Sequence, residues 1–201
     1  MNNDTFATKG NLMKAKKTLA LCQMGFDLLD RKRNVLIREI LQLIDNAKAL
    51  NGTVEQTFLR AYEALENANI TLGVIENLAH SVDIDDGLEI SYRNVMGVDV
   101  PMLELKPKEL NISYGMYNTN SQLDIAYIEF AKAKKLCVLL AETETAIFRL
   151  SNAIKRVQRT ANSLKNVQIP KYQDIVTQIS DTLEEREREE FSQLKVIKSK
   201  K

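Results

Sequence analysis

The sequence is poor in the residues that most catalytic and metal sites require. Among its 201 residues there is no tryptophan and a single histidine, His80. One histidine cannot by itself build a histidine-based zinc site or a Ser-His-Asp triad. The seven glycines form no G-x-x-x-x-G-K-[ST] phosphate loop, and no nucleophile has a base partner in view. We therefore expect no catalytic residue, no cofactor, no cofactor-binding residue and no metal site in this chain.

Other absences bear on where the protein works. There is no run of about 18 apolar residues and no apolar core of a signal peptide, so we expect no direct membrane insertion. The two cysteines, Cys22 and Cys137, lie far apart, which is typical of reduced, buried thiols in a cytosolic protein. A net charge of +1 gives the whole chain no drive toward nucleic acid or an anionic membrane.

Aromatic residues make up only 6% of the chain, which favours helical seams of Leu, Ile and Ala over a large globular core. Glycine and proline concentrate between residues 81 and 120 and are sparse on either side. This punctuation predicts an N-terminal coiled-coil helix with an extension over residues 1–80. It also predicts a central region with a β-hairpin and a loop over 81–120, and a C-terminal coiled-coil helix over 121–201.

The N-terminal zone carries a heptad seam. Alternating steps of three and four residues from Leu12 to Leu50 reach twelve positions, of which eleven are apolar and one is Arg33. This spacing predicts a coiled-coil helix, with Arg33 as the single charged seam residue. We expect the helix to bend or to be interrupted near Gly52, its weakest point.

The C-terminal zone repeats the rhythm. The stripe runs from Leu123 to Leu164 with one reset at Thr143, and continues through Tyr172, Val176, Ile179 and Leu183. We expect Pro170 to kink or locally break this helix, because it lacks a backbone N–H. Glu184 and Arg188 are spaced for an i,i+4 ion pair.

The central region alternates with period two, which predicts a short hairpin with its turn between Arg93 and Gly97. We expect a loop from Pro101 to Thr119. The apolar positions of the predicted hairpin are Leu88, Ile90, Tyr92, Val98 and Val100.

Residues 9–38 contain eight basic and two acidic residues, a local charge of +6. Such a cluster is either a solvated helix face or a contact for an acidic partner surface. Nucleic acid fits less well, because no aromatic side chains are interleaved with the charges. The candidate partner-binding residues are Lys14, Lys17, Arg31, Lys32, Arg33, Arg38 and Arg188.

Two terminal motifs resemble those of the D subunit of V-type and A-type rotary ATPases. The family opens with T-K and then carries G-x-x-L-L-x-x-K-R, matched here by Thr8, Lys9, Gly25, Leu28, Leu29, Lys32 and Arg33. Its second signature is matched by Asn162, Leu164, Ile169, Pro170, Glu185, Glu187, Arg188, Glu189 and Lys195. Lys165 stands where the family more often has Glu.

The resemblance covers nearly the full chain and implies a mainly α fold. The N- and C-terminal helices would form a long antiparallel coiled coil, with short helices and a β-hairpin in the central region. The resemblance also implies a function, that of a non-catalytic rotor axle in the central stalk. Such an axle transmits torque between ATP turnover in a ring of A and B subunits and H⁺ or Na⁺ translocation.

The implied partners are the F subunit of the central stalk, the A and B subunits of the catalytic ring, and a funnel-shaped subunit above the membrane ring, with no nucleic acid. The implied place is the cytoplasmic side of a bacterial or archaeal membrane, as a peripheral subunit. A free-standing coiled-coil scaffold or tether explains the heptads equally well, but it explains neither the two motifs nor the hairpin.

Overall fold

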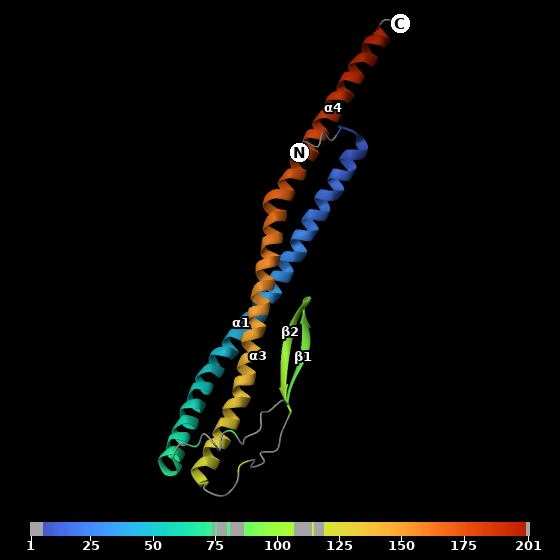
Figure 1. Ribbon diagram of the computed structural model, residues 1–201. Coiled ribbons are helices and arrows are strands. Elements are labelled where there is room, and N and C mark those ends of the chain that lie inside the picture. The colour runs from blue at the N-terminus through green and yellow to red at the C-terminus, as the bar shows by residue number, and fades with distance from the viewer. Residues whose placement is uncertain are drawn as a thin grey trace. The chain divides into compact units, whose positions relative to one another are not determined.

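The computed structural model describes residues 6–73, 75, 80, 87–106, 114 and 119–199. In chain order the elements are α1 (Lys9–Leu72), β1 (Leu88–Val95), β2 (Val98–Leu105), α3 (Ser121–Ser163), the π-helix η1 (Leu164–Gln168) and α4 (Ile169–Ser199) (Figure 1). The predicted mainly α fold with a small antiparallel hairpin is confirmed. Much of the sequence beside the hairpin, where short helices were predicted, lies outside the described residues.

The chain divides into two compact units. The terminal unit comprises Met1–Asn34 and Ile154–Lys201, and the hairpin unit comprises Val35–Ala153. Because α1 and α3 each pass from one unit into the other, every unit contains one stretch of α1 and one stretch from the C-terminal helices.

Both ends of α1 are capped by their own sequence. The Thr8 hydroxyl oxygen accepts a hydrogen bond from the Asn11 N–H at 3.2 Å, and the Thr8 carbonyl accepts one from Leu12 at 2.9 Å. This is the N-cap geometry that threonine favours. At the other end Gly73 adopts φ 77° and its N–H donates to the Asn69 carbonyl at 2.9 Å. A left-handed glycine here ends the helix at little steric cost.

The predicted seams coincide with the covered faces of the helices. All twelve positions from Leu12 to Leu50 are half-buried or buried, and Leu36 is fully buried. Leucines of α1 outside the seam, such as Leu21, Leu28 and Leu41, are 55–69% exposed. The stripe in α3 and α4 behaves in the same way, with Leu150 and Ile179 almost fully buried. The heptad pattern therefore identified the packed faces.

Of the two outcomes predicted near Gly52, a bend or an interruption, the interruption was wrong, because α1 is continuous through this point. The side chains of Thr53 and Thr57 donate hydrogen bonds to the carbonyls of Ala49 and Thr53, at 3.1 and 2.8 Å. Threonine hydroxyls bonded to the carbonyl four residues earlier are accommodated in a continuous helix, although they often bend it slightly.

Replacing Gly52 with alanine is expected to raise the free energy of unfolding by about 0.5–1 kcal/mol. A Cβ built on Gly52 meets nothing within 4 Å, so the gain in helix propensity is not offset by a clash. Gly73→Ala is the matched control, since its φ of 77° makes the same substitution strained. Urea denaturation would measure both, and a Gly52→Ala variant less stable than wild type would contradict the helical geometry at this position.

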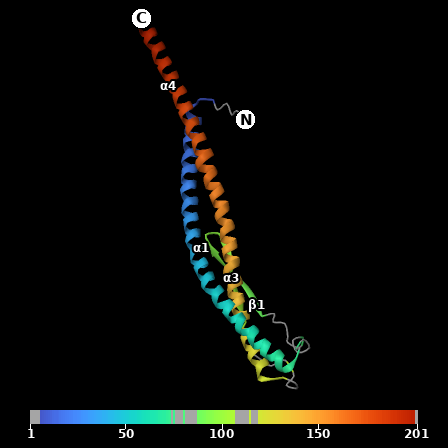
Figure 2. The ribbon, with the colours of Figure 1, turned by 90° about the vertical axis from the view of Figure 1, so that its left-hand side faces the viewer.

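In the terminal unit, α1 and α4 run antiparallel and side by side (Figures 1 and 2). The Lys9 ammonium lies 2.9 Å from a Glu187 carboxylate oxygen, and Arg186 donates to the Ala7 carbonyl at 3.2 Å. Further along, the Lys165 ammonium lies 5.7 Å from the centre of the Phe26 ring. Such a cation–π contact contributes about 0.5–1 kcal/mol at exposed sites. The contacts near Lys9 and the contact at Phe26 are both consistent with the same antiparallel register of the two helices.

The kink or break predicted at Pro170 takes the form of a five-residue π-helix, Leu164–Gln168, which ends two residues before the proline. The Ile169 N–H donates to the Leu164 carbonyl, five residues back, and the α-helix resumes at Ile169. Proline removes one donor and crowds the carbonyl four residues earlier, and a wider π turn relieves both. The helix therefore changes pitch locally and continues.

In the hairpin unit, β1 and β2 pair antiparallel through a tight turn at Met96–Gly97, with φ of 50° and 78°. Two positive φ values are typical of a type I′ turn. The turn confirms the predicted hairpin, but β2 runs on to Leu105 where a loop was expected from Pro101. Lys106 donates to the Gly87 carbonyl, which by alternation places Pro101 and its partner Tyr92 at a non-hydrogen-bonded pair. Proline therefore costs no hydrogen bond between the two strands.

The hairpin is attached to both helices of its unit. Glu142 of α3 accepts the Leu103 N–H at 3.0 Å, and Arg149 of α3 donates to the Asp99 carbonyl at 3.0 Å. The Arg149 guanidinium also lies 5.3 Å from the centre of the Tyr92 ring. On the other side, Arg93 lies 3.8 Å from Glu39 of α1. Side chains from α3 thus cover the outer edge of β2.

A small core lies between the end of α1 and the start of α3. Ala68, Tyr114 and Leu123 are buried together, with Leu72, Ile75 and Tyr127 packed against them. The Tyr114 hydroxyl donates to Asp124 at 2.6 Å, and its ring meets Tyr127 edge-on. Burial, and then the hydrogen bond to Asp124, raise the pKa of Tyr114 to about 12.

This raised pKa predicts an alkaline loss of stability that Tyr114→Phe removes. The unfolded chain releases the phenol proton first, so the contribution is complete below about pH 10 and is lost as pH rises toward 12. At pH 7 the free energy of unfolding of the variant should be about 1–2 kcal/mol lower than that of wild type. The hydrogen bond to the Asp124 carboxylate is gone, while the exposed Asp124 stays hydrated. Denaturation of both proteins from about pH 8 to 11.5 measures how the free energy of unfolding depends on pH. If it falls equally steeply for wild type and variant, the hydroxyl of Tyr114 is not buried as described.

Candidate partner-binding surfaces

Five of the seven basic residues predicted to bind a partner are exposed, and Lys32 and Arg33 are half-buried. Lys14, Lys17 and Arg31 are exposed, and Lys32 is half-buried, all in the part of α1 that belongs to the terminal unit. Arg38 is also exposed but belongs to the hairpin unit. The predicted residues of α1 are therefore divided between the two units.

Arg33 occupies the seam without reaching across it. Its guanidinium lies 2.6 Å from Asp30 of the same helix, and its side chain is 29% exposed. An ion pair one turn apart satisfies the charge locally. The alkyl stem of Arg33 can thus line the seam while the charged end stays at its margin.

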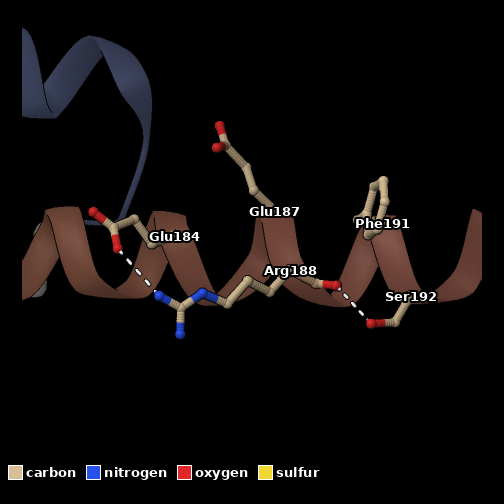
Figure 3. Close-up of a pocket in the computed structure, with 5 residues that line it drawn as sticks. All are labelled: Glu184, Glu187, Arg188, Phe191 and Ser192. Carbon is tan, nitrogen blue, oxygen red and sulfur yellow. Dashed lines mark hydrogen bonds and ion pairs between the residues drawn. The ribbon is translucent and has the colours of Figure 1, made fainter.

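Arg188 lies in α4, where the predicted pair with Glu184 is present at 3.6 Å. These two residues, with Glu187, Phe191 and Ser192, line a shallow surface hollow formed by side chains of one helix (Figure 3). Glu187 points away from Arg188 in this view and pairs with Lys9. Hydrogen bonding with Glu187 raises the pKa of Lys9, and the same contact lowers the pKa of Glu187. The hollow has no walls from a second element, so it is a feature of the helix surface.

The α4 helix continues beyond the Lys9–Glu187 pair, where α1 no longer runs beside it. Glu187 pairs with Lys9, the first residue of α1, and α4 ends twelve residues later at Ser199. Phe191, Leu194 and Ile197 in this extension are 60–70% exposed.

The five predicted hairpin residues divide between the two strands. Leu88, Ile90 and Tyr92 of β1 are 43–60% exposed. Val98 is half-buried and Val100 is 4% exposed. The strand β2 therefore supplies the buried apolar residue Val100, while β1 carries exposed apolar side chains and contacts the helices through Tyr92 and Arg93.

A second basic group was not predicted from the sequence. Lys155, Arg156 and Arg159 are exposed on α3 within the terminal unit. The signal that could have revealed it is an absence, because residues 145–173 contain no aspartate or glutamate. A stripe of apolar positions says nothing of the charge that the remaining positions carry.

The described residues contain no group of three or more His, Cys, Asp or Glu side chains placed to hold a metal ion. Cys22 and Cys137 are free and half-buried. Within the described ranges, no helix has the length and apolar character required to cross a bilayer.

Comparison with known proteins finds similarity along nearly the whole chain. The family model for the D subunit of ATP synthase matches residues 11–199. The V-type ATP synthase D subunit of Thermotoga neapolitana is 40% identical over 195 residues, with 96% of each chain covered. The A-type ATP synthase D subunit of Methanosphaera stadtmanae is 35% identical, covering 95% of this chain and 92% of that protein. That of Pyrococcus abyssi is 32% identical, covering 96% and 92%.

Proposed function

Because this chain belongs to the D-subunit family of V-type and A-type ATP synthases, we propose that it is the rotor axle of such a complex. In this role it transmits torque between ATP turnover in a ring of A and B subunits and H⁺ or Na⁺ movement through a membrane ring. Membership already makes it a component of a multi-subunit ATP synthase, with relatives in bacteria and archaea. The axle role, the identity of its partners and its peripheral position on the cytoplasmic side are the proposal.

The observation that carries the proposal is the pairing of long helices in both units. A single helix of 64 residues contributes to both units, and in each it pairs with the C-terminal helices. In the terminal unit Lys9–Glu187 and Phe26–Lys165 join the paired helices, and in the hairpin unit the edge-on rings of Tyr62 and Phe130 do so. Torque can pass along paired helices because each resists bending and twisting through its own hydrogen-bonded backbone and through the shared seam.

The proposed partners meet different parts of the chain. The A and B subunits surround the terminal unit, where Lys14, Lys17, Arg31, Lys32 and Arg33 lie. The F subunit and the funnel-shaped subunit bind elsewhere, and the exposed apolar side chains of β1 make the hairpin a candidate contact for a rotor partner. No step of ATP chemistry is assigned to this chain.

The assembly claim is tested by co-expressing the chain with A, B and F subunits of one complex. We expect a stable complex in which one copy of this chain accompanies the ring, and crosslinks from α1 positions 14–33 to A and B. A chain that remains monomeric beside assembled A and B subunits would favour a free-standing scaffold and contradict the proposal.

A further inference from the structure

The seam of the C-terminal helices contains one irregular step, and this step coincides with η1. In the terminal unit its covered positions follow one another by three or four residues, except for the step of five from Leu164 to Ile169. The half-buried or buried positions are Ile154, Val157, Ala161, Leu164, Ile169, Tyr172, Val176, Ile179 and Leu183. An unbroken heptad frame would instead place Lys171 and Gln178 on the seam, and both are exposed. The frame therefore advances by one residue within η1.

The π turn accommodates this extra residue. The Ile169 N–H donates to the Leu164 carbonyl, so one turn of backbone contains one residue more than an α turn. In a continuous α-helix, the extra residue would rotate everything after it by about 100°. That rotation would carry the α4 seam away from α1 and separate Glu187 from Lys9, which lie 2.9 Å apart. Thus η1 keeps both parts of the seam facing the same partner helix.

Packing at η1 is weaker than on either side of it. None of its five residues is buried, whereas Ala161 before it and Ile179 after it are 1% and 4% exposed. The residue of α1 that faces η1 is Gly25, which has no side chain to pack against it. A Cβ at this position would lie 3.8 Å from Cδ1 of Leu164. The seam is therefore held mainly by the residues that flank the π turn.

The hydrogen bonds and side-chain contacts of η1 also leave it free to change its pitch. Pro170 has no N–H to donate to the Asn166 carbonyl, which would be its acceptor in an α-helix. Lys165 meets the Phe26 ring at 5.7 Å through a long side chain, which can follow a rotation of the backbone. Few contacts have to break for this turn to wind or unwind.

We propose that η1 is a torsional joint, at which α4 turns about its own axis relative to α3. The α1 seam keeps regular steps of three and four past Gly25, so only one helix of the pair contains an extra residue. Winding or unwinding η1 rotates α4 while the α-helices on both sides keep their hydrogen bonds. The joint is a property of the chain alone. Its use in taking up twist under torque rests on the proposed function.

The test removes the extra residue. The joint-free variant lacks Val167, which is 56% exposed, and carries Pro170→Ala, so that Ile169 follows Leu164 by four residues and the seam becomes regular. Pro170→Ala alone keeps the extra residue and isolates the effect of the proline. Backbone hydrogen exchange, measured by mass spectrometry on the full chain, and thermal unfolding followed by circular dichroism are compared with wild type.

The matched control lacks one residue of α4 away from the joint. Deleting the exposed Gln178 moves Ile179 and Leu183 about 100° around the helix and out of the seam. We expect this deletion to lower the midpoint of thermal unfolding by at least about 5 °C. The joint-free variant should instead unfold at the temperature of wild type or above it, because its seam gains a regular frame.

In wild type we expect the amides of residues 165–169 to exchange at least about tenfold faster than those of residues 157–161. In the joint-free variant the two segments should differ by less than about threefold, while Pro170→Ala alone should leave exchange at the joint fast. Slow exchange at residues 165–169 in wild type would overturn the joint. Fast exchange that persists in the joint-free variant would overturn it as well.

The use of the joint under torque is tested in the complex with A and B subunits. A bead on the hairpin, observed without ATP, should fluctuate over a narrower range of angles with the joint-free variant than with wild type. An unchanged range would overturn the uptake of twist at η1 and leave the axle role standing. If the wild-type bead never rotates under ATP, the axle role fails, and hydrogen exchange alone decides whether η1 is a joint.

Discussion

Replacing Leu36 with alanine is expected to lower the free energy of unfolding by about 2–5 kcal/mol. Leu36 lies on the α1 seam of the hairpin unit and is fully buried. The substitution removes three carbon atoms from a packed interface and leaves a cavity that stiff helices close only in part. Few single changes in this chain should cost more, because only Leu36 and Leu150 are large side chains buried this completely among the described residues.

Leu41→Ala supplies the control for this prediction. Leu41 lies five residues further along the same helix and in the same unit, but it is 55% exposed. We expect its loss to cost less than about 1 kcal/mol, since a mostly hydrated side chain has little transfer energy to lose. Guanidinium denaturation followed by circular dichroism would measure both variants. Equal effects would show that the seam is not the packed face in solution.

Removing the hairpin is expected to change function while the helices stay folded. The deletion runs from Leu88 to Leu105 and joins Gly87 to Lys106, whose backbones are already hydrogen-bonded at 2.9 Å. The variant loses the contacts of Glu142, Arg149 and Glu39 with the hairpin but keeps the α1–α3 seam. We therefore expect helix content to be retained. The ATPase rate of the complex assembled with A, B and F subunits, or the affinity for a rotor partner, should fall by at least about threefold.

Point variants on β1 separate a contact from a general loss of structure. Ile90→Ser with Tyr92→Ser removes two exposed apolar side chains, and Ser91→Ala changes a neighbour on the opposite face. If β1 meets a partner, the double variant reproduces much of the deletion and Ser91→Ala does not. An unchanged ATPase rate and partner affinity in the deletion would contradict the contact. Unfolding of the whole chain would show that the hairpin is part of the core.

The sequence predicted the helical framework because a heptad stripe directly reports which face of a helix is covered. The seam from Leu12 to Leu50 and the stripe ending at Leu183 both coincide with the packed faces. The hairpin turn was also predicted, because glycine after Met96 is suited to positive φ. These features depend on residues close together in the chain.

The errors concern features that depend on residues far apart. Whether Pro101 ends a strand depends on which residue of β1 faces it, and Tyr92 stands at a non-hydrogen-bonded position. Whether Gly52 interrupts a helix depends on the packing of the seam on either side, and α1 stays helical through it.

The exposed basic residues Lys155, Arg156 and Arg159 of α3 were overlooked because a stripe of apolar positions does not report the charge of the positions between them. The partner of Arg33, by contrast, is local. Asp30 of the same helix holds its guanidinium, although the sequence alone also allowed a partner across the seam or outside the chain.

The central claim is that this chain turns within a ring of A and B subunits. The most direct test immobilises the ring, attaches a bead or gold particle to a cysteine introduced on the hairpin at Ser91, and records the particle under ATP. The proposal predicts rotation in one direction, in steps that depend on ATP concentration, and its loss when ATP is withdrawn. A particle that stays fixed relative to a ring that hydrolyses ATP at its full rate would contradict the axle role.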